Sequence, residues 1–446
     1  MNPAVFREYD VRGLVENDLH ENFVYNLGRA IGTLAGGQGI MSIGRDCRLS
    51  SAKLAAVLAD GLMASGITIV DIGLCATPML YFSIHQLKLD GGVMVTGSHN
   101  PPEFNGFKIC IGKETIHGEK IQQLYQIMLA ESFHQGRGGR SATSVTNAYA
   151  TRLLSDIQIR KGIKVAVDSG NGVGGIFLLP LLKECGCEVL DLYCTPDGSF
   201  PNHFPDPTVA ENLSDLISLV KKEKAELGIA FDGDADRIGA ITDNGDIVWG
   251  DLLLALFARD ILRKNHGATI IGEVKCSNRL YDAIALSGGK GIMWKAGHSL
   301  IKEKMKETGA LLAGEMSGHM FFADRYYGYD DAIYAALRLL EVISREEKPL
   351  SQIMSVFPPS FSTPEIRIEC PDAKKFAVVE EVKTILAKSY ETNTIDGVRI
   401  ASKEGWGLLR ASNTQPVLVL RFESDSQAGL TKIRSVVEET LKMVMG

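Results

Sequence analysis

The sequence lacks any long hydrophobic run. The longest uninterrupted stretch of apolar residues in the 446-residue chain is Leu252–Ala258, whereas a helix that spans a membrane needs about 20 such residues. Six charged residues among the first twenty would also interrupt the apolar core of a secretory signal. We therefore expect no membrane span, no export signal and a cytoplasmic location.

The sequence also lacks runs of positive charge and cysteine motifs that bind metals. Lys and Arg number 47 against 54 Asp and Glu, a net charge of -7, and no basic cluster of the kind that binds nucleic acid stands out. The one close cysteine pair, Cys185 and Cys187, does not have the CxxC spacing of zinc or redox sites. We expect reduced thiols, no nucleic-acid or membrane partner, and a small-molecule ligand.

Three segments of the chain repeat one order of elements: an apolar strand, a polar loop, an amphipathic helix, a glycine and a second strand. They span residues 41–71, 164–191 and 268–294. Each predicts a βαβ unit with two parallel strands. From about Phe361 the pattern changes to shorter strands and helices, which indicates a smaller α+β tail.

A chain of this length is too long for one hydrophobic core and suggests three or four domains. We expect three similar α/β domains with mixed sheets, followed by a smaller α+β C-terminal domain, around a central cleft. The segment 135–143 is rich in Gly, Arg and Ser and indicates the first boundary. The expected domains are residues 1–143, 144–246, 247–357 and 358–446.

Each repeat is followed by a further apolar strand that runs into a polar loop. These loops read TGSHNPPEFNGFK at 96–108, DGDADR at 232–237 and GEMSGH at 314–319. In open α/β sheets, ligands bind beyond the carboxyl ends of the strands. The three loops are therefore expected to face one cleft between domains.

Ser98 lies in the first of these loops, where two glycines and two prolines favour turns. Such a loop would point the Ser98 hydroxyl outward beside His99, Asn100 and Lys108. A serine that only caps a turn is the commoner case. The neighbouring Lys108 and His99, however, could neutralise a phosphate, which a capping serine does not need.

Asp232, Asp234 and Asp236 alternate with small residues, so that an extended segment would place all three carboxylates on one side. Three converging carboxylates suit a hard divalent cation, and Mg²⁺ fits best because it prefers few carboxylates together with a phosphate oxygen. The loop does not match an EF-hand, which needs Gly and Glu where this chain has Arg237 and Asp243. A phosphatase-type nucleophile at Asp232 and a solvated acidic turn remain alternatives.

Two other loops offer polar groups with weaker signals. In GEMSGH, Glu315 and Ser317 could bind a pair of sugar hydroxyls if the loop is extended. In the tail, RASNTQP at 410–416 carries a guanidinium, hydroxyls and an amide that could surround a phosphate. The alternatives are a Gly-flanked turn and an ordinary hairpin, and Arg421 in the following strand could equally face solvent.

The four loops in this order, after an opening Tyr9-Asp10-Val11-Arg12-Gly13, resemble the α-D-phosphohexomutase superfamily, and most closely its phosphomannomutase/phosphoglucomutase branch. The resemblance covers the whole chain. It implies four domains, the fourth of a type similar to TATA-binding protein. Ala235 stands where Gly is often found, which we expect to matter little, and Met316 differs from the Gln usual in glucosamine-phosphate mutases.

The resemblance also implies roles for the matching residues. Ser98 would be the phosphoserine and, with Asp232, Asp234 and Asp236, would hold Mg²⁺. The other implied groups are catalytic residues Arg12, Lys108 and His298; residues lining the reacting side, Tyr9, Arg237 and Lys275; sugar-binding residues Glu315, Ser317 and His319; and distal-phosphate residues Arg410, Ser412, Asn413 and Thr414. The domains would then be a phosphoserine, a metal-binding, a sugar-binding and a phosphate-binding domain.

The expected activity is the reversible interconversion of hexose 6-phosphate and hexose 1-phosphate, on mannose and also on glucose. It would proceed through the phosphoserine enzyme and a hexose 1,6-bisphosphate, which would also act as activator. We expect a monomer or weak dimer. The rival functions are phosphoglucosamine mutase, a phosphosugar-binding regulatory protein without turnover, and a metal-dependent phosphatase that uses Asp232.

Overall fold

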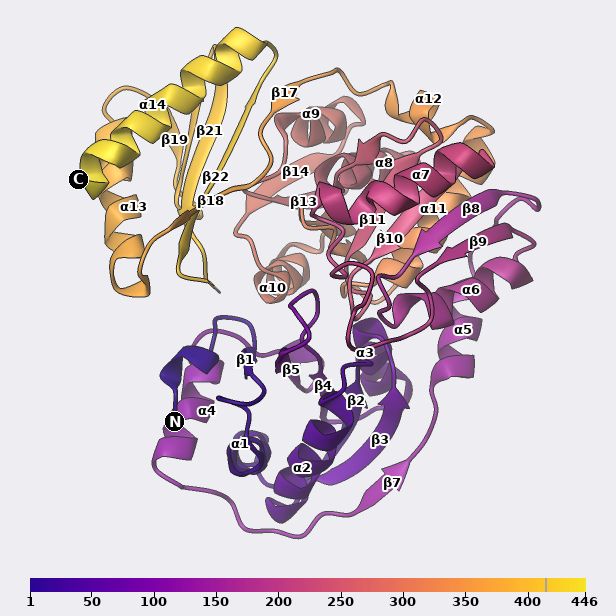
Figure 1. Cartoon of the computed structure of the whole chain (residues 1–446), viewed down its shortest axis with the longest axis vertical. Coiled ribbons are helices and arrows are strands. Elements are labelled where there is room, and N and C mark those ends of the chain that lie inside the picture. Colours follow the sequence, from indigo (N-terminus) through magenta and orange to yellow (C-terminus); the bar gives the residue numbers. More distant parts are fainter. Residues whose placement is uncertain (414) are drawn as a thin grey trace.

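The computed structural model describes residues 1–413 and 415–446. It contains four sheets, which are arranged as four domains around a common centre (Figure 1). Among the described residues, no helix has the length and apolar character needed to cross a membrane.

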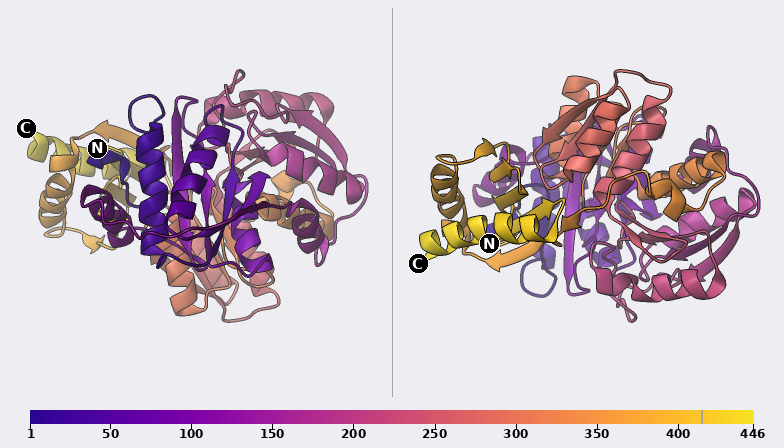
Figure 2. Two further views of the ribbon diagram at one scale, coloured as in Figure 1. Left: turned by 90° about the horizontal axis from the view of Figure 1, so that it is seen from below. Right: turned by 90° about the horizontal axis from the view of Figure 1, so that it is seen from above.

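The first domain contains a seven-stranded sheet in the order β1-β5-β4-β2-β3-β7, with β6 beside β5. Its elements are η1 (Pro3–Val5), β1 (Val11–Leu14), α1 (Glu21–Leu34), β2 (Ile40–Arg45), α2 (Ser51–Ala64), β3 (Thr68–Leu74), α3 (Thr77–Gln86), β4 (Gly91–Val95), β5 (Phe104–Ile111), β6 (Glu114–Thr115), α4 (Glu119–Leu129) and β7 (Arg140–Ala142). Figure 2 shows α1 and α2 side by side on one face of this sheet. The two helices can approach closely because Gly28 and Gly61 have no side chain. A Cβ atom at either position would clash with the backbone of the other helix.

The second and third domains repeat the arrangement with fewer strands. The second has a five-stranded sheet in the order β12-β11-β10-β8-β9 and the third a four-stranded sheet in the order β14-β13-β15-β16. The second comprises α5 (Thr146–Leu154), β8 (Lys164–Asp168), α6 (Gly174–Glu184), β9 (Glu188–Leu192), η2 (Ala210–Leu213), α7 (Ser214–Glu223), β10 (Leu227–Phe231), β11 (Ile238–Thr242) and β12 (Ile247–Val248). The third comprises α8 (Gly250–Leu262), β13 (Thr269–Glu273), α9 (Asn278–Leu286), β14 (Lys290–Trp294), α10 (His298–Thr308), β15 (Leu312–Gly314), β16 (Met320–Phe322), α11 (Ala332–Glu346) and α12 (Leu350–Met354).

The three sheets share one core of three parallel strands and one antiparallel neighbour. The parallel strands are β3-β2-β4, β9-β8-β10 and β14-β13-β15, and the antiparallel partners are β5, β11 and β16. This confirms the predicted βαβ repeats and the mixed sheets. In each domain the loop predicted to carry chemistry follows the third parallel strand, namely β4, β10 or β15.

The tail domain holds a six-stranded sheet in the order β17-β22-β21-β20-β19, with β18 beside β22. Its elements are β17 (Phe361–Ser362), β18 (Ile366–Glu369), α13 (Asp372–Leu386), β19 (Glu391–Asn393), β20 (Val398–Ser402), β21 (Gly405–Ala411), β22 (Val417–Ser424) and α14 (Gln427–Met445). The N-terminal segment lies beside this domain in the views of Figures 1 and 2, and Arg7 and Asp372 come within 3.8 Å of each other.

One hydrophobic core joins the first three domains. The cluster includes Met79 and Phe82 of α3, Tyr149 of α5, and buried residues of α6, α8 and α11. The tail domain instead has its own core between its sheet and helices α13 and α14. The loops after β4, β10 and β15 therefore belong to one continuous packed body. The tail has its own core and meets the third domain through a small apolar cluster of Val274, Trp406 and Leu408.

Candidate active site

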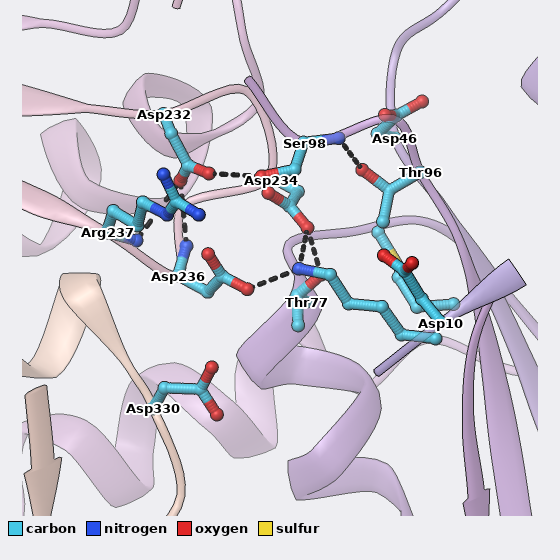
Figure 3. Close-up of polar contacts among 12 residues, drawn as sticks. Asp10, Asp46, Thr77, Thr96, Ser98, Asp232, Asp234, Asp236, Arg237 and Asp330 are labelled. Atoms are coloured by element: carbon cyan, nitrogen blue, oxygen red, sulfur yellow. Dashed lines mark hydrogen bonds and ion pairs between the residues drawn. The ribbon is translucent and has the colours of Figure 1, made fainter. Parts of the chain in front are cut away.

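Ser98 lies just after the end of β4 in a strained backbone conformation. Its φ is +50°, in the left-handed region that side chains disfavour, and its amide donates to Thr96 Oγ1 at 2.8 Å. The side chain is buried and donates a hydrogen bond to Asp232 Oδ2 at 2.7 Å. Figure 3 shows this contact, which joins the first domain to the second.

The three aspartates converge because the DGDADR loop forms a tight turn. Asp232 Oδ1 accepts hydrogen bonds from the backbone amides of Asp236 and Arg237, each at 3.1 Å. The turn places Ala235 at φ +57°. The loop is therefore not extended, and convergence of the carboxylates comes from the turn rather than from strand alternation.

Ala235 also corrects an expectation from the sequence. We expected the Ala-for-Gly difference to matter little, but the left-handed conformation costs an L-residue roughly 1–2 kcal/mol. Ala235 is fully buried in the core that joins the domains. Its methyl packing partly offsets that cost, and the position has a conformational preference for glycine that the sequence pattern alone did not reveal.

The acidic cluster has the composition of a site for a hard cation. Oxygen atoms of Asp232, Asp234 and Asp236 lie within 4.8 Å of one another, and all three side chains are buried. The Oδ1 atoms of Asp234 and Asp236 are also buried and have no hydrogen-bond partner in the described part of the chain. Buried carboxylate oxygens without donors are costly unless a cation contacts them, so these residues fit a divalent metal.

Lys108, on β5, brings a positive charge into this cluster. Its Nζ donates to Asp234 Oδ2 at 2.7 Å and also to Asp236. Burial alone would lower the pKa of this ammonium, but Asp234 and Asp236 raise it above its ordinary value. For Asp232, burial and then the charges of Asp234 and Asp236 raise the pKa of the carboxyl. Lys108 is therefore a fixed cation at neutral pH.

Arg12 and Tyr9 come from the segment that enters the first sheet. Arg12 binds Asp10 Oδ2 and Asn100 Oδ1, each at 2.5 Å, so that it lies beside the loop of Ser98. The Tyr9 hydroxyl donates to the carbonyl of Ala296 at 2.7 Å and accepts from Asn413 Nδ2 at 2.6 Å. Tyr9 thus connects the first, third and tail domains.

His319 and His298 approach the acidic cluster from the third domain. His319 Nε2 accepts from Arg237 Nε at 3.1 Å, and His319 Nδ1 lies 3.1 Å from Asp330 Oδ2. His298 is the first residue of α10, and its Nδ1 is 4.0 Å from the same carboxylate oxygen. Burial lowers the pKa of His298 well below its ordinary value, so this imidazole is neutral.

The GEMSGH loop closes as a turn between β15 and β16. The amide of Gly318 donates to the carbonyl of Glu315 at 3.0 Å, and Glu315 Oε1 accepts from the amide of Gly297 at 2.8 Å. Ser317 is partly exposed. Glu315 and Ser317 therefore share a turn rather than one side of an extended segment.

Lys275 follows β13 and faces the tail domain. Its Nζ donates to Glu365 Oε2 at 3.1 Å and lies 3.8 Å from Glu273 Oε1. Burial would lower the pKa of this ammonium, but Glu273 and Glu365 raise it. Lys275 remains charged at neutral pH.

The tail loop RASNTQP reaches the same region. Arg410 Nε donates to Asp396 Oδ2 at 3.0 Å, and the amide of Ala296 donates to the same oxygen at 3.1 Å. Ser412 is buried, and Asn413 binds Tyr9 as described above. Thr414 lies outside the described residues.

Arg421 does not face solvent, which was one of two possibilities left by the sequence. Its side chain is buried, and it donates to Asp251 Oδ2 at 2.9 Å and to the carbonyl of Lys275. Arg399 of β20, which is separated from β22 by β21 in the same sheet, donates to the carbonyl of Cys276 at 2.9 Å. Two arginines of the tail domain therefore hold the backbone around Lys275.

Several residues of the site were not predicted from the sequence. Thr77, the first residue of α3, donates from Oγ1 to Asp234 Oδ2 at 2.5 Å (Figure 3). Asp330 is fully buried, and Lys302 Nζ donates to it at 3.1 Å, in addition to the contact with His319. Asp330 stands in the pair Asp330-Asp331 just before a helix, and this doubled carboxylate was the one signal that could have singled it out.

The structure thus brings together Ser98, the three aspartates, Lys108, Arg237 and His319 in direct contacts. Three further residues surround this group. Arg12 contacts Asn100, His298 lies near Asp330, and Tyr9 binds the carbonyl of Ala296. Glu315 meets the loop before His298, and Arg410 reaches the same loop through Asp396. Lys275 is farther along the interface between the third and tail domains.

Four family models match the chain in order. They are described as phosphoglucomutase/phosphomannomutase alpha/beta/alpha domains I, II and III, at residues 3–135, 145–245 and 249–361, and the C-terminal domain of the same family, at 365–440. Together they cover most of the sequence.

Individual relatives agree over nearly the full length. The chain is 48% identical to phosphomannomutase/phosphoglucomutase of Pseudomonas aeruginosa over 445 residues, which are 99% of this chain and 96% of that protein. It is 45% identical to phosphoglucomutase of Neisseria gonorrhoeae over 438 residues, 97% of this chain and 95% of that protein.

A solved structure of a phosphoglucomutase/phosphomannomutase family protein from Burkholderia thailandensis superimposes with a TM-score of 0.94 at 41% identity, and covers 100% of this chain and 98% of that one. The two structures therefore agree over all four domains, in addition to the agreement of the sequences. This chain belongs to the phosphoglucomutase/phosphomannomutase family.

Proposed function

We propose that the chain interconverts hexose 6-phosphates and hexose 1-phosphates, with mannose and glucose as the sugars, and that Ser98 carries the transferred phosphoryl group. The observation that supports this most directly is the contact of Ser98 Oγ with Asp232 Oδ2 at 2.7 Å. It places the hydroxyl at the cluster of carboxylates, beside a buried cation, Lys108.

The proposed metal is Mg²⁺, held by Asp232, Asp234, Asp236 and an oxygen of phosphorylated Ser98. The unpartnered Oδ1 atoms of Asp234 and Asp236 support this assignment. When bound, Mg²⁺ would neutralise charge on the phosphoryl oxygens.

The remaining side chains of the site are assigned roles in phosphoryl transfer according to their charge. In the transfer step the bond between phosphorus and Ser98 Oγ breaks and a bond forms from phosphorus to a sugar hydroxyl oxygen. That hydroxyl loses its proton, and the leaving Ser98 oxygen takes up a proton to become a hydroxyl again. Lys108 and Arg237 are fixed cations that stabilise the negative charge spread over the transferring group. His298 is the proposed proton acceptor, because the Asp330 carboxylate near its Nδ1 would stabilise the imidazolium that forms. Arg12 is proposed to stabilise charge beside Ser98.

The second phosphate of the intermediate would be bound by the tail loop. Arg410 is proposed to bind it with Ser412, Asn413 and Thr414, and Asp396 now pairs with that guanidinium. Because this loop is separate from Ser98, a hexose 1,6-bisphosphate could turn over and return its other phosphate to the serine. The same bisphosphate would rephosphorylate Ser98 and act as activator.

Sugar recognition is proposed for the GEMSGH turn. Glu315, Ser317 and His319 come from one loop whose ends are fixed by Gly318 and by the Glu315 contact to Gly297. Tyr9 and Lys275 are proposed to complete the lining of the substrate site. The relatives described above are a phosphomannomutase/phosphoglucomutase and a phosphoglucomutase, which supports activity on both sugars.

The proposed domain boundaries are 1–143, 144–246, 247–357 and 358–446, for phosphoserine, metal, sugar and distal-phosphate functions. We propose a monomer or weak dimer in the cytoplasm. The eight cysteines are all unpaired, as a reducing compartment requires.

A coupled mutase assay tests the function on one preparation, with Mg²⁺ and a trace of hexose 1,6-bisphosphate. Mannose, glucose and glucosamine phosphates are compared, and inorganic phosphate is measured in parallel. We expect turnover of the mannose and glucose phosphates without stoichiometric phosphate release. Turnover of glucosamine phosphate alone, phosphate release as the main reaction, or no reaction would each contradict the proposal and favour one of the rivals.

A further inference from the structure

Arg48 lies beneath the loop of Ser98, and neither the sequence patterns nor the proposed mechanism uses it. It follows β2 in the segment Arg45-Asp46-Cys47-Arg48, and its guanidinium is buried. The guanidinium binds four backbone carbonyls of the Ser98 loop. Nη2 donates to Ser98 O at 2.8 Å and Asn100 O at 2.5 Å, and Nη1 donates to Pro101 O at 2.6 Å and Phe104 O at 3.0 Å.

Asp46 completes this arrangement from the same segment. Its Oδ2 lies 3.2 Å from Arg48 Nε and accepts from the amide of Gly97, also at 3.2 Å. Its Oδ1 accepts from Ser51 Oγ at 2.5 Å. The charge of Arg48 is therefore balanced within the protein, and its donors are directed to the loop rather than to a substrate.

The loop needs such support because its backbone is strained. Ser98 has φ +50°, and a side chain on Gly97 would come within 2.5 Å of the Arg48 guanidinium. A left-handed serine persists only where its surroundings hold it. The guanidinium supplies a rigid planar fork that binds the carbonyl of Ser98 and three carbonyls that follow it, an arrangement that a flexible ammonium could not match.

The second domain packs on the other side of the same residue. The ring centroid of Phe200 lies 4.9 Å from the guanidinium carbon of Arg48. A side chain on Gly198 would meet the carbonyl of Cys47 at 2.5 Å, so this contact is close. Arg48 is thus enclosed by the domain that also carries Asp232.

We propose that Arg48 is a positioning residue for phosphoryl transfer: by binding four carbonyls around Ser98 and stacking on Phe200, it fixes the serine against the acidic cluster of the second domain. The inference rests on the proposed function, because it concerns the serine that carries the phosphoryl group. A shift of about 1 Å in a reacting group can reduce a rate by about 100-fold.

The test compares Arg48→Lys and Arg48→Gln with Arg338→Lys. Arg338 is a matched control because it is equally buried and binds Asp324 through two hydrogen bonds, at 2.9 and 3.0 Å, away from the site. We expect kcat to fall about 10-fold or more in Arg48→Lys and about 100-fold in Arg48→Gln, with KM within about 3-fold of the native value. KM is retained because the distal phosphate is bound by another domain. Arg338→Lys should keep kcat within about 2-fold.

Hydrogen exchange provides a readout that does not depend on activity. Peptides covering residues 96–104 should exchange faster in both Arg48 variants than in the native chain and in Arg338→Lys, by about 10-fold or more. Unchanged exchange of these peptides would overturn the inference. Equal losses of kcat in the Arg48 and Arg338 variants would also overturn it. So would a rise in KM that accounts for the whole loss of kcat/KM. If the native chain showed no turnover, the proposed function would fail, while the exchange comparison would still decide whether Arg48 holds the loop of Ser98.

Discussion

At the scale of single residues, charge balance dominates the site. Three buried carboxylates are opposed by the charges of Lys108 and Arg237, which leaves one negative charge in excess among these five groups when all three carboxyls are ionised. That excess is the physical reason why a divalent cation fits here. It also explains why burial and the neighbouring aspartates raise the pKa of Asp232.

Magnesium should therefore stabilise the folded chain. We expect addition of Mg²⁺ to a chelator-treated sample to raise the melting temperature, because a ligand that binds only the folded state stabilises it by mass action. At about 100 times the dissociation constant, the gain is about 2.7 kcal/mol. Asp236→Asn should lose most of this rise, whereas the exposed control Asp246→Asn should keep it. An equal rise in both variants would contradict the metal assignment, whatever the effect on activity.

The sequence predicted most single residues of the site but not their contacts. Ser98 and the aspartates follow apolar strands, so their place at the strand ends was predictable. Thr77 could not be predicted, and Asp330 had only the signal of the Asp330-Asp331 pair, because both reach the cluster from helix starts that only the packing of domains brings close. The backbone strain at Ala235 was missed because the spacing of residues does not reveal the backbone angle φ.

At the scale of elements, glycines decide whether a loop can form its turn. Gly318 has φ +94°, and a side chain there would meet the carbonyl oxygen of Ile238 at 2.3 Å. The GEMSGH turn is therefore held against the start of β11, next to the metal-binding turn. Its geometry depends on the absence of a side chain at this position.

Gly318→Ala should lower the melting temperature and raise KM for the phosphosugar by about 10-fold or more, because the turn that carries Glu315 and Ser317 must shift. The matched control is Gly36→Ala, which has a similar φ of +88° but no atom within 4 Å of the added carbon. Both variants incur the left-handed strain of roughly 1–2 kcal/mol. If Gly36→Ala raised KM as much as Gly318→Ala, or if neither did, the proposed role of the turn in sugar binding would be contradicted.

The start of α11 contains a carboxyl with an unusual pKa. Asp331 caps this helix by accepting from the amide of Tyr334 at 2.8 Å, and it accepts from the hydroxyl of Tyr149 at 2.9 Å. Burial raises its pKa from 3.8 to about 7 despite these hydrogen bonds. The folded chain therefore keeps a proton that the unfolded chain releases between these two values.

This group should make the protein less stable as the pH rises. Its contribution is fully present below about pH 4 and is lost as the pH rises through about 7. Between pH 5 and pH 8 the free energy of unfolding should fall by roughly 2–3 kcal/mol more in the native chain than in Asp331→Asn. The exposed control Asp60→Asn should follow the native chain. Identical pH dependence in the native chain and Asp331→Asn would rule out the raised pKa.

Most elements of the first three domains were predictable because hydrophobic periodicity and glycine spacing repeat along the chain. The segment 135–143, expected as a boundary, contributes β7, which pairs with β3 through backbone atoms. Its polar side chains carry no strand pattern, so the pairing could not be read from the sequence. In the tail, a strand before the loop RASNTQP was expected, but the bounds of β21 were not predicted because Gly405–Ala411 mix apolar and polar types without clear alternation.

At the scale of the whole molecule, the site exists only where domains meet. Ser98 meets Asp232 across one interface, Arg237 meets His319 across the next, and Asn413 meets Tyr9 across a third. The first three domains share a core, while the tail packs separately and holds the backbone around Lys275 through Arg399 and Arg421. Because the tail has its own core, we expect it to be the domain that moves as substrate enters or leaves.

The central claim, that Ser98 carries the phosphoryl group, is tested most directly by intact mass and peptide mapping after incubation with hexose 1,6-bisphosphate and Mg²⁺. We expect one added phosphate that maps to Ser98, its loss on addition of excess hexose phosphate, and neither addition nor mutase turnover in Ser98→Ala. A phosphate on Asp232, or full turnover by Ser98→Ala, would contradict the account.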